Sequence, residues 1–347
     1  MVIDHGLEVA TELLPFLRVL KNGTVERLYK PQLTPPSLQA ETTNGVLSKD
    51  TIISLDVSAR LYLPNNPTNK LPILVYFHGG GFCIESAFST FCHEYINIIA
   101  SQANVIIVSV DYRLAPEHPI PAAYEDSWTA LQWVASHFTK EHNEIYEPWL
   151  TKHGDFDHLY IGGDSAGANI AHHMCMRAEV EELNNGVKIL GAFLSHPYFL
   201  GSKSVGSEPL DIATRESTGL YKTWMVVYPN AIDGIDSPWI NPFAKSAPCL
   251  DGLGCKRLMV CIASEDELRE RGFHYYESVK KSGWGGELLL FEVEGEGHTF
   301  HVFNTKTENA KKMFKRLARF LQVVPTTLSN CGCIDEAISN VIDEYTK

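Results

Sequence analysis

Short apolar runs, each bounded by glycine, proline or polar residues, recur along most of the chain. Runs of roughly four to eight apolar residues are typical of strands that are buried on both faces of a sheet. Longer stretches with apolar residues at helical spacing lie between several of these runs. The pattern predicts strands at 51–54, 59–63, 73–77, 105–109, 159–162, 189–195, 257–263 and 288–293, and helices at 122–137, 168–174 and 309–321.

Strands and helices therefore alternate through the middle and the end of the chain. Such alternation indicates an α/β fold with a mostly parallel sheet and helices on both faces. The first two strands, 51–54 and 59–63, are expected to pair antiparallel, because only a short turn separates them. The predicted core covers residues 46–325, and residues 326–347 form an appendage after Pro325.

Two segments depart from the alternating pattern. Residues 7–20 carry apolar residues at roughly helical spacing, and three prolines then break the chain into an extended arm that ends near residue 45. Residues 201–228 interrupt the strand–helix series and predict a cap region. Its aromatic side chains Tyr221 and Trp224, together with Phe82 beside a glycine-rich loop, are candidates to line a pocket for a flat, apolar substrate. Packing of these side chains on the core is an equally good interpretation of each one.

The strongest chemical signal is a serine between two glycines. The segment Gly163-Asp164-Ser165-Ala166-Gly167 joins the strand at 159–162 to the helix that follows. A strand, a G-x-S-x-G turn and a helix form a nucleophile elbow, in which the tight turn exposes the serine hydroxyl. The helix N-terminus directs free N–H groups and its positive dipole end at a developing anion. Ser165 is therefore the candidate nucleophile.

A second glycine-rich turn follows the strand at 73–77. It reads His78-Gly79-Gly80-Gly81-Phe82, so several backbone N–H groups lack both strand partners and shielding side chains. Donors of this kind bind the oxyanion of a tetrahedral intermediate, together with the N–H of the residue after the nucleophile. Gly80, Gly81 and Ala166 are the candidate oxyanion-hole residues.

A base and an acid are expected further along the chain, in the order Ser, then Asp or Glu, then His. Asp266 follows the strand at 257–263, and His298 follows the strand at 288–293. Open α/β sheets carry their sites at the carboxyl ends of such strands. Asp266 and His298 are the candidates, with Glu265 and Glu267 as alternatives to the acid and His301 as the alternative to the base.

The combined motifs resemble the hormone-sensitive-lipase-like branch of the α/β-hydrolases, and their finer detail is similar to the plant carboxylesterases of that branch. The resemblance implies an α/β-hydrolase fold with a helical cap, to which residues 1–45 contribute. It runs from about residue 16 to about residue 321. The motifs that carry it are 78–82, 82–87, 112–117, 121–126, 163–167, 269–272 and 297–301.

This plant group also contains 2-hydroxyisoflavanone dehydratases, alkaloid cyclases, tuliposide-converting enzymes and the gibberellin receptor. The receptor lacks the catalytic histidine, whereas His298 is present here. Dehydratase relatives can carry threonine as the nucleophile, so Ser165 favours acyl transfer. The prediction is a serine carboxylesterase acting on an ester of a small plant specialised metabolite. The alternative is a non-hydrolytic lyase, dehydratase or cyclase of alkaloid or flavonoid metabolism.

Composition narrows the range of partners. The net charge is −13, and the acidic residues are dispersed, so nucleic acid is an unsuitable partner. The eight cysteines show no zinc-type pairing, and Cys331 and Cys333 are assigned to a loosely ordered tail rather than to a redox or metal pair. We expect neither a signal peptide nor a membrane-spanning segment. We expect a cytoplasmic enzyme without cofactor or metal, and a monomer and a dimer both remain open.

Overall fold

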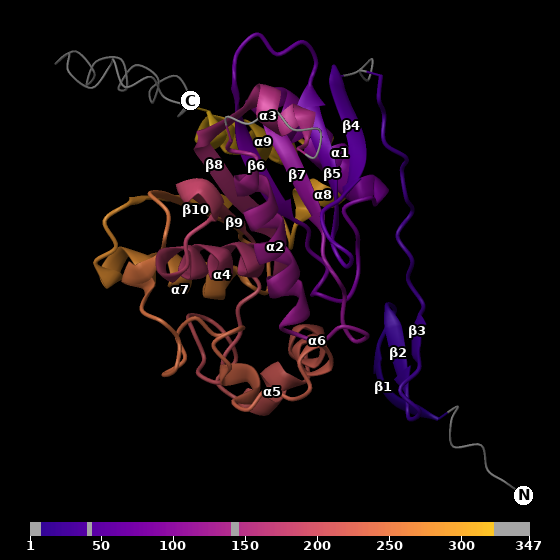
Figure 1. The fold of residues 1–347 in the computed structure, drawn as a ribbon. Coiled ribbons are helices and arrows are strands. Elements are labelled where there is room, and N and C mark those ends of the chain that lie inside the picture. Colours follow the sequence, from indigo (N-terminus) through magenta and orange to yellow (C-terminus); the bar gives the residue numbers. More distant parts are fainter. Residues whose placement is uncertain (1–7, 40–43, 140–145, 323–347) are drawn as a thin grey trace, which may run out of the picture.

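A central eight-stranded sheet organises the chain (Figure 1). The computed structural model describes residues 8–39, 44–139 and 146–322. The strand order is β11-β10-β9-β8-β6-β7-β5-β4; β4 and β5 pair antiparallel, as do β5 and β7, and the other neighbours are parallel. The strands are β4 (Val46–Ile52), β5 (Ser58–Pro64), β6 (Leu71–Phe77), β7 (Ile106–Asp111), β8 (Gly154–Asp164), β9 (Ile189–Ser195), β10 (Arg257–Ala263) and β11 (Glu287–Val293).

Helices cover both faces of this sheet and divide the core into two apolar layers. The layer on one face includes side chains of α1 and α9, and the layer on the other includes side chains of α2, α4 and α7. None of the helices in the described part of the chain is long and apolar enough to span a bilayer. The helices are α1 (Thr90–Ala103), α2 (Ala122–Ser136), α3 (Pro148–His153), α4 (Ala166–Val180), α7 (Arg269–Ser282), α8 (Phe300–Phe303) and α9 (Glu308–Leu321), with 3-10 turns η2 (Asn184–Gly186), η3 (Gly234–Asp236) and η4 (Leu250–Gly252).

The predicted fold class is confirmed, and each predicted strand has a counterpart in the sheet. Helices α1 and α7 were not predicted, because polar residues occupy some of their core-facing positions. In α1, His93 and Asn97 are buried, and in α7 Arg271 is buried. The predicted appendage, with Cys331 and Cys333, lies outside the described residues.

The spacing of apolar residues in 7–20 indicated a helix, and this interpretation is wrong. This segment forms β1 (Val9–Leu13) and β2 (Leu17–Leu20), which join β3 (Val25–Arg27) in a small antiparallel sheet. A turn closed by the 2.7 Å hydrogen bond from Phe16 N–H to the Leu13 carbonyl brings Leu13 and Leu17 opposite each other. The spacing of four residues therefore arises from a cross-strand pair rather than from a helical turn.

Residues 201–228, called the cap segment below, contain α5 (Ile212–Glu216) and α6 (Gly219–Val227). Figure 1 shows both helices at one end of the molecule, with the small sheet β1–β3 beside α6. Strand β1 contacts α6. The N-terminal arm and the cap segment are thus neighbours in space although they are far apart in the sequence.

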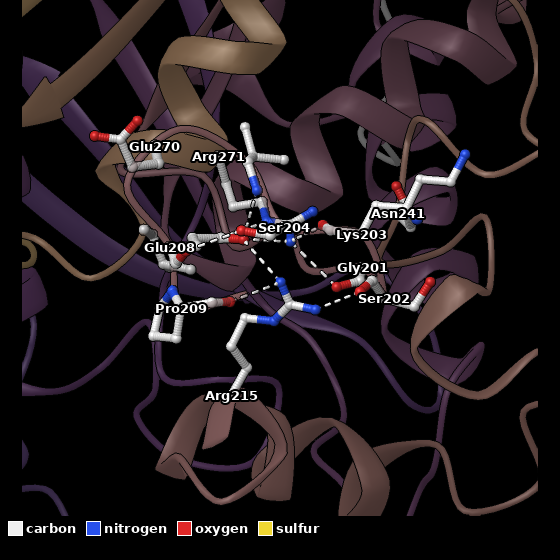
Figure 2. Close-up of polar contacts among 12 residues, drawn as sticks. Gly201, Ser202, Lys203, Ser204, Glu208, Pro209, Arg215, Asn241, Glu270 and Arg271 are labelled. Carbon is white, nitrogen blue, oxygen red and sulfur yellow. Dashed lines mark hydrogen bonds and ion pairs between the residues drawn. The ribbon is translucent and has the colours of Figure 1, made fainter. Parts of the chain in front are cut away.

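A buried ionic cluster fastens the cap segment to α7, as Figure 2 shows. Glu208 accepts hydrogen bonds of 2.6 and 2.7 Å from Arg271, and Arg215 lies 3.7 Å from the same carboxylate. The two guanidinium groups also donate to backbone carbonyls of the cap segment. These carbonyls belong to Gly201, Ser202, Lys203 and Pro209.

Candidate active site

Ser165 lies between the end of β8 and the start of α4, in a strained backbone conformation. Its φ and ψ are 56° and −114°. Non-glycine residues at positive φ are uncommon, and such strain is found at functional sites. Only glycine fits on either side of the serine. A Cβ on Gly163 would lie 2.4 Å from the Phe77 carbonyl oxygen, and a Cβ on Gly167 would lie 1.9 Å from the same oxygen. The G-x-S-x-G spacing is therefore a steric requirement of this turn.

Hydrogen bonds of the Ser165 backbone hold the turn against the next strand. Its N–H donates to the Ser195 carbonyl at 2.8 Å, and its own carbonyl accepts from the Tyr198 N–H at 3.1 Å. The residue is 7 % exposed. The hydroxyl thus has a fixed position at the carboxyl edge of the sheet and remains accessible.

The structure brings Ser165, His298 and Asp266 into one hydrogen-bonded line. The distance from Ser165 Oγ to His298 Nε2 is 2.9 Å, and that from His298 Nδ1 to Asp266 Oδ2 is also 2.9 Å. Asp266 is 7 % exposed, whereas both alternative acids, Glu265 and Glu267, are exposed. The loop after β10 therefore directs only the aspartate toward the histidine.

His301, the alternative base, lies behind the elbow and contacts a different carboxylate. It is fully buried, and its Nε2 lies 2.8 Å from Asp164 Oδ1. The other oxygen of Asp164 accepts a 2.8 Å hydrogen bond from the Tyr76 hydroxyl. His301 thus supports the residue that precedes Ser165 and does not contact the Ser165 hydroxyl.

Both buried carboxylates are held in the ionised form. Burial raises the pKa of Asp266, but hydrogen bonds from His196 and His298 outweigh that effect and hold its pKa well below the usual range. Burial likewise raises the pKa of Asp164, and the interactions with His301, Ser195 and Tyr76 together lower it more strongly. Asp266 is therefore an anion at neutral pH and can orient the His298 ring.

His196 is a site residue that the sequence analysis missed. Its Nδ1 lies 2.8 Å from Asp266 Oδ2, the oxygen that also contacts His298. His196 directly follows β9, so the rule that selected Asp266 and His298 by their place after a strand would have selected it as well. In the described part of the chain, His196, Asp266 and His298 are the group with metal-ligand spacing. Their hydrogen bonds to one another account for this clustering.

The glycine loop presents free donors beside the serine. Gly80 and Gly81 have φ of 98° and 57°, and the Gly80 carbonyl closes the turn by accepting from Cys83 N–H and Ile84 N–H at 3.0 and 2.9 Å. Among residues 8–39, 44–139 and 146–322, no group accepts a hydrogen bond from the N–H of Gly80, Gly81 or Ala166. These three N–H groups, predicted as oxyanion donors, are available to a ligand.

Replacing Gly81 by alanine is expected to lower kcat for ester hydrolysis by about 10²-fold, the effect of losing one oxyanion donor. A Cβ there would lie 2.9 Å from the Thr223 methyl group, at a φ of 57° that disfavours side chains, so the loop must shift. Gly186→Ala is the matched control, because Gly186 has a φ of 71° with open space around it. Steady-state kinetics check both variants, and an equal loss of activity in the two would contradict the assignment.

A pocket of about 450 Å³ opens onto Ser165 and His298. Aromatic and aliphatic side chains from distant parts of the chain form most of its wall. They include Phe16, Tyr29, Ile84, Phe91, Leu220, Val302 and Phe303.

The aromatic residues predicted for this wall lie elsewhere. Phe82 and Trp224 are fully buried and pack edge to face with each other, and the Trp224 ring N–H donates to the Gly234 carbonyl at 2.9 Å. Tyr221 lines an adjoining groove, and its hydroxyl donates to the Gly201 carbonyl at 2.9 Å. These side chains serve packing because their rings face the core, a direction that composition alone does not show.

A mixed sheet covered on both faces, with a serine, a histidine and an aspartate aligned at its carboxyl edge, defines the class of α/β-hydrolases. The model of the alpha/beta hydrolase fold family matches residues 74–302 of this chain. The chain belongs to this family and, within it, to the plant carboxylesterase group that its motifs resemble.

Two plant proteins and one solved structure illustrate the likeness. The chain is 52 % identical to 2-hydroxyisoflavanone dehydratase of Glycyrrhiza echinata, over 90 % of this chain and 96 % of that protein. It is 43 % identical to probable carboxylesterase 1 of Arabidopsis thaliana, over 91 % and 98 %. The hyperthermophilic esterase of the archaeon Pyrobaculum calidifontis matches with a TM-score of 0.62 and 27 % identity, covering 79 % of this chain and 85 % of that structure.

Proposed function

We propose that the protein is a serine carboxylesterase that hydrolyses an ester of a small plant specialised metabolite through an acyl-serine intermediate. The observation that carries the proposal is the 2.9 Å contact between Ser165 Oγ and His298 Nε2, beside three N–H groups that lack a partner in the described residues. A positioned base activates a serine hydroxyl, which is otherwise a weak nucleophile.

The geometry supports a two-step acyl transfer. His298 takes the proton from Ser165 as the oxygen attacks the ester carbonyl, and the N–H groups of Gly80, Gly81 and Ala166 stabilise the resulting oxyanion. The protonated His298, stabilised by the Asp266 carboxylate, then donates its proton to the departing alcohol. Water repeats the attack with His298 as base, which releases the acid and restores the serine.

The acyl-enzyme provides the direct test. Wild type mixed with p-nitrophenyl butyrate should release a burst of p-nitrophenol, and acid quenching should leave a butyryl group on the peptide that contains Ser165, detected by mass spectrometry. Ser165→Ala should show neither the burst nor the adduct. Equal turnover by both proteins would overturn the proposal.

A lyase, dehydratase or cyclase is the second candidate, favoured by the 52 % identity to a 2-hydroxyisoflavanone dehydratase. In such a reaction His298 would move protons, and the oxyanion donors would polarise a carbonyl without an acyl-serine. The two candidates are separated with the natural substrate, found by screening plant-metabolite extracts for compounds that the enzyme consumes. Retained activity in Ser165→Ala, with loss in His298→Ala, would favour the second candidate.

The pocket also predicts a charge preference. Glu85 lines it, one carboxylate oxygen accepts a 2.6 Å hydrogen bond from the Tyr29 hydroxyl, and no Lys or Arg of the described residues lies within 4.0 Å of it. A substrate cation near this carboxylate and the surrounding aromatic rings gains about 1 kcal/mol, or roughly fivefold in kcat/KM.

Paired esters of equal shape check this preference. Butyrylcholine should be hydrolysed roughly fivefold faster than its uncharged isostere 3,3-dimethylbutyl butyrate, and Glu85→Gln should abolish the difference. Competition kinetics with both esters measure the ratio directly. A ratio of one in wild type would contradict the predicted preference and leave the esterase proposal unaffected.

A further inference from the structure

The carboxylate of Asp266 receives three N–H donors. His298 and His196 both direct Nδ1 at Oδ2, at 2.9 and 2.8 Å, and the Leu268 N–H contacts Oδ1 at 2.9 Å. A histidine and an aspartate that activate a serine need only one of these imidazoles. The second imidazole therefore requires its own explanation.

His196 is held rigidly in this position. It is 1 % exposed, its N–H donates to the Cys261 carbonyl at 2.8 Å, and its φ of 50° is unusual for a non-glycine residue. Its ring stacks on His301 at 5.5 Å and meets the His298 ring edge to face at 5.7 Å. Backbone strain of this kind persists where the surrounding structure enforces it, as at functional sites.

His196 is a neutral donor. Burial lowers its pKa to about 4, although the hydrogen bond to Asp266 opposes this effect. The Nδ1–H tautomer must therefore face the carboxylate, and within the described residues Nε2 has no hydrogen-bond partner. A neutral donor stabilises the anion of Asp266 without cancelling its charge.

We propose that His196 is a positioning residue that acts through Asp266, fixing the carboxylate and sharing the oxygen that orients His298. The inference rests on the proposed esterase function. An oxygen shared between two donors attracts the imidazolium form of His298 less strongly than an oxygen reserved for it. His196 thus divides Oδ2 between two rings and fixes the carboxylate against which His298 is oriented.

The direction of the pH effect follows from the charges around this pair. The titratable groups that face the two rings are Asp266, His301 and, through His301, Asp164. Both acids are ionised at neutral pH, so they contribute a constant field. Removing the His196 donor leaves Asp266 free to favour protonated His298. The acid limb of kcat/KM then moves to higher pH.

Three proteins test the inference: wild type, His196→Asn and His196→Leu. The Asn side chain places an N–H donor near the former Nδ1 and tolerates positive φ, whereas Leu has similar bulk and no donor. With p-nitrophenyl butyrate, His196→Leu should move the acid limb upward by roughly half to one pH unit and lower kcat about tenfold, the scale of a lost hydrogen bond to a charged group. His196→Asn should keep the wild-type limb.

An unchanged limb in His196→Leu, even at reduced activity, would show that His196 only fills space and would overturn the inference. A shift to lower pH would overturn it as well. If His196→Leu fails to fold, His196→Gly gives the same comparison without Cβ strain at this φ. If the Ser165→Ala variant hydrolyses the ester as fast as wild type, the esterase proposal is refuted instead, so the two failures are distinguishable.

Discussion

His298→Ala is expected to lower kcat/KM for p-nitrophenyl butyrate by about 10³-fold or more, while the protein melts close to wild type. Without the imidazole, Ser165 keeps its proton near neutral pH, and only the free N–H donors continue to stabilise the transition state. The His298 side chain is 34 % exposed and lies in the turn after β11, so its removal sacrifices little packing. Steady-state kinetics and thermal unfolding measure the two effects separately.

His158→Ala is the suitable control for this experiment. His158 is partly exposed and pairs with Asp155 at 2.7 Å on β8, before that strand reaches Ser165. His301→Ala is unsuitable, because it would leave the buried Asp164 carboxylate short of a donor and destabilise the elbow. An active His298→Ala enzyme, or a His158→Ala enzyme that is equally inactive, would contradict the assignment of the base.

Glu208→Gln is expected to reduce the free energy of unfolding by about 3 kcal/mol, which is the scale for breaking a buried ion pair by removing one partner. Its carboxylate contacts both Arg271 and Arg215 (Figure 2), and the side chains of these two arginines are only 2 % and 4 % exposed. The amide can still accept one hydrogen bond but cannot compensate two buried guanidinium charges. Denaturant unfolding of wild type and variant measures the difference.

An exposed ion pair provides the comparison. Glu12 and Arg18 lie 3.2 Å apart with side chains 45 % and 39 % exposed, so Glu12→Gln should cost less than about 1 kcal/mol. The same carboxylate-to-amide change thus distinguishes a buried from a solvated environment. Equal losses in the two variants would show that the cluster on Glu208 does not stabilise the fold.

The chemical centre was predictable because its residues follow local rules. Ser165 directly follows a strand, Asp266 and His298 lie in the loops that follow two others, and the carboxyl ends of parallel strands meet at one edge of the sheet. The two glycine turns are likewise local, since the missing side chains are needed by the turn itself. The choice of Asp266 over its acidic neighbours needed the structure, because burial decides which of three adjacent carboxylates faces inward.

The pocket and the N-terminal arm depend on contacts between remote segments, which no local pattern reports. Phe16 and Phe303 line the same pocket although nearly the whole chain separates them. Trp224 is a residue type that often lines apolar pockets, yet its ring faces the core. The pair Leu13 and Leu17 shows the same limitation, since one spacing fits a helix and a hairpin equally well.

The turn around Ser165 carries the reactive groups and the pocket wall contacts the substrate, and this separation has an evolutionary consequence. The turn around Ser165 has no space for a side chain at Gly163 or Gly167, so these two glycines cannot be replaced without moving the serine. Parts of the pocket wall come from the N-terminal arm and the cap segment, through Phe16, Tyr29 and Leu220, which contact none of the aligned serine, histidine and aspartate by a hydrogen bond and can therefore change one at a time. A duplicated gene therefore reaches a new substrate by a few exchanges on these surfaces and inherits its reactive chemistry unchanged.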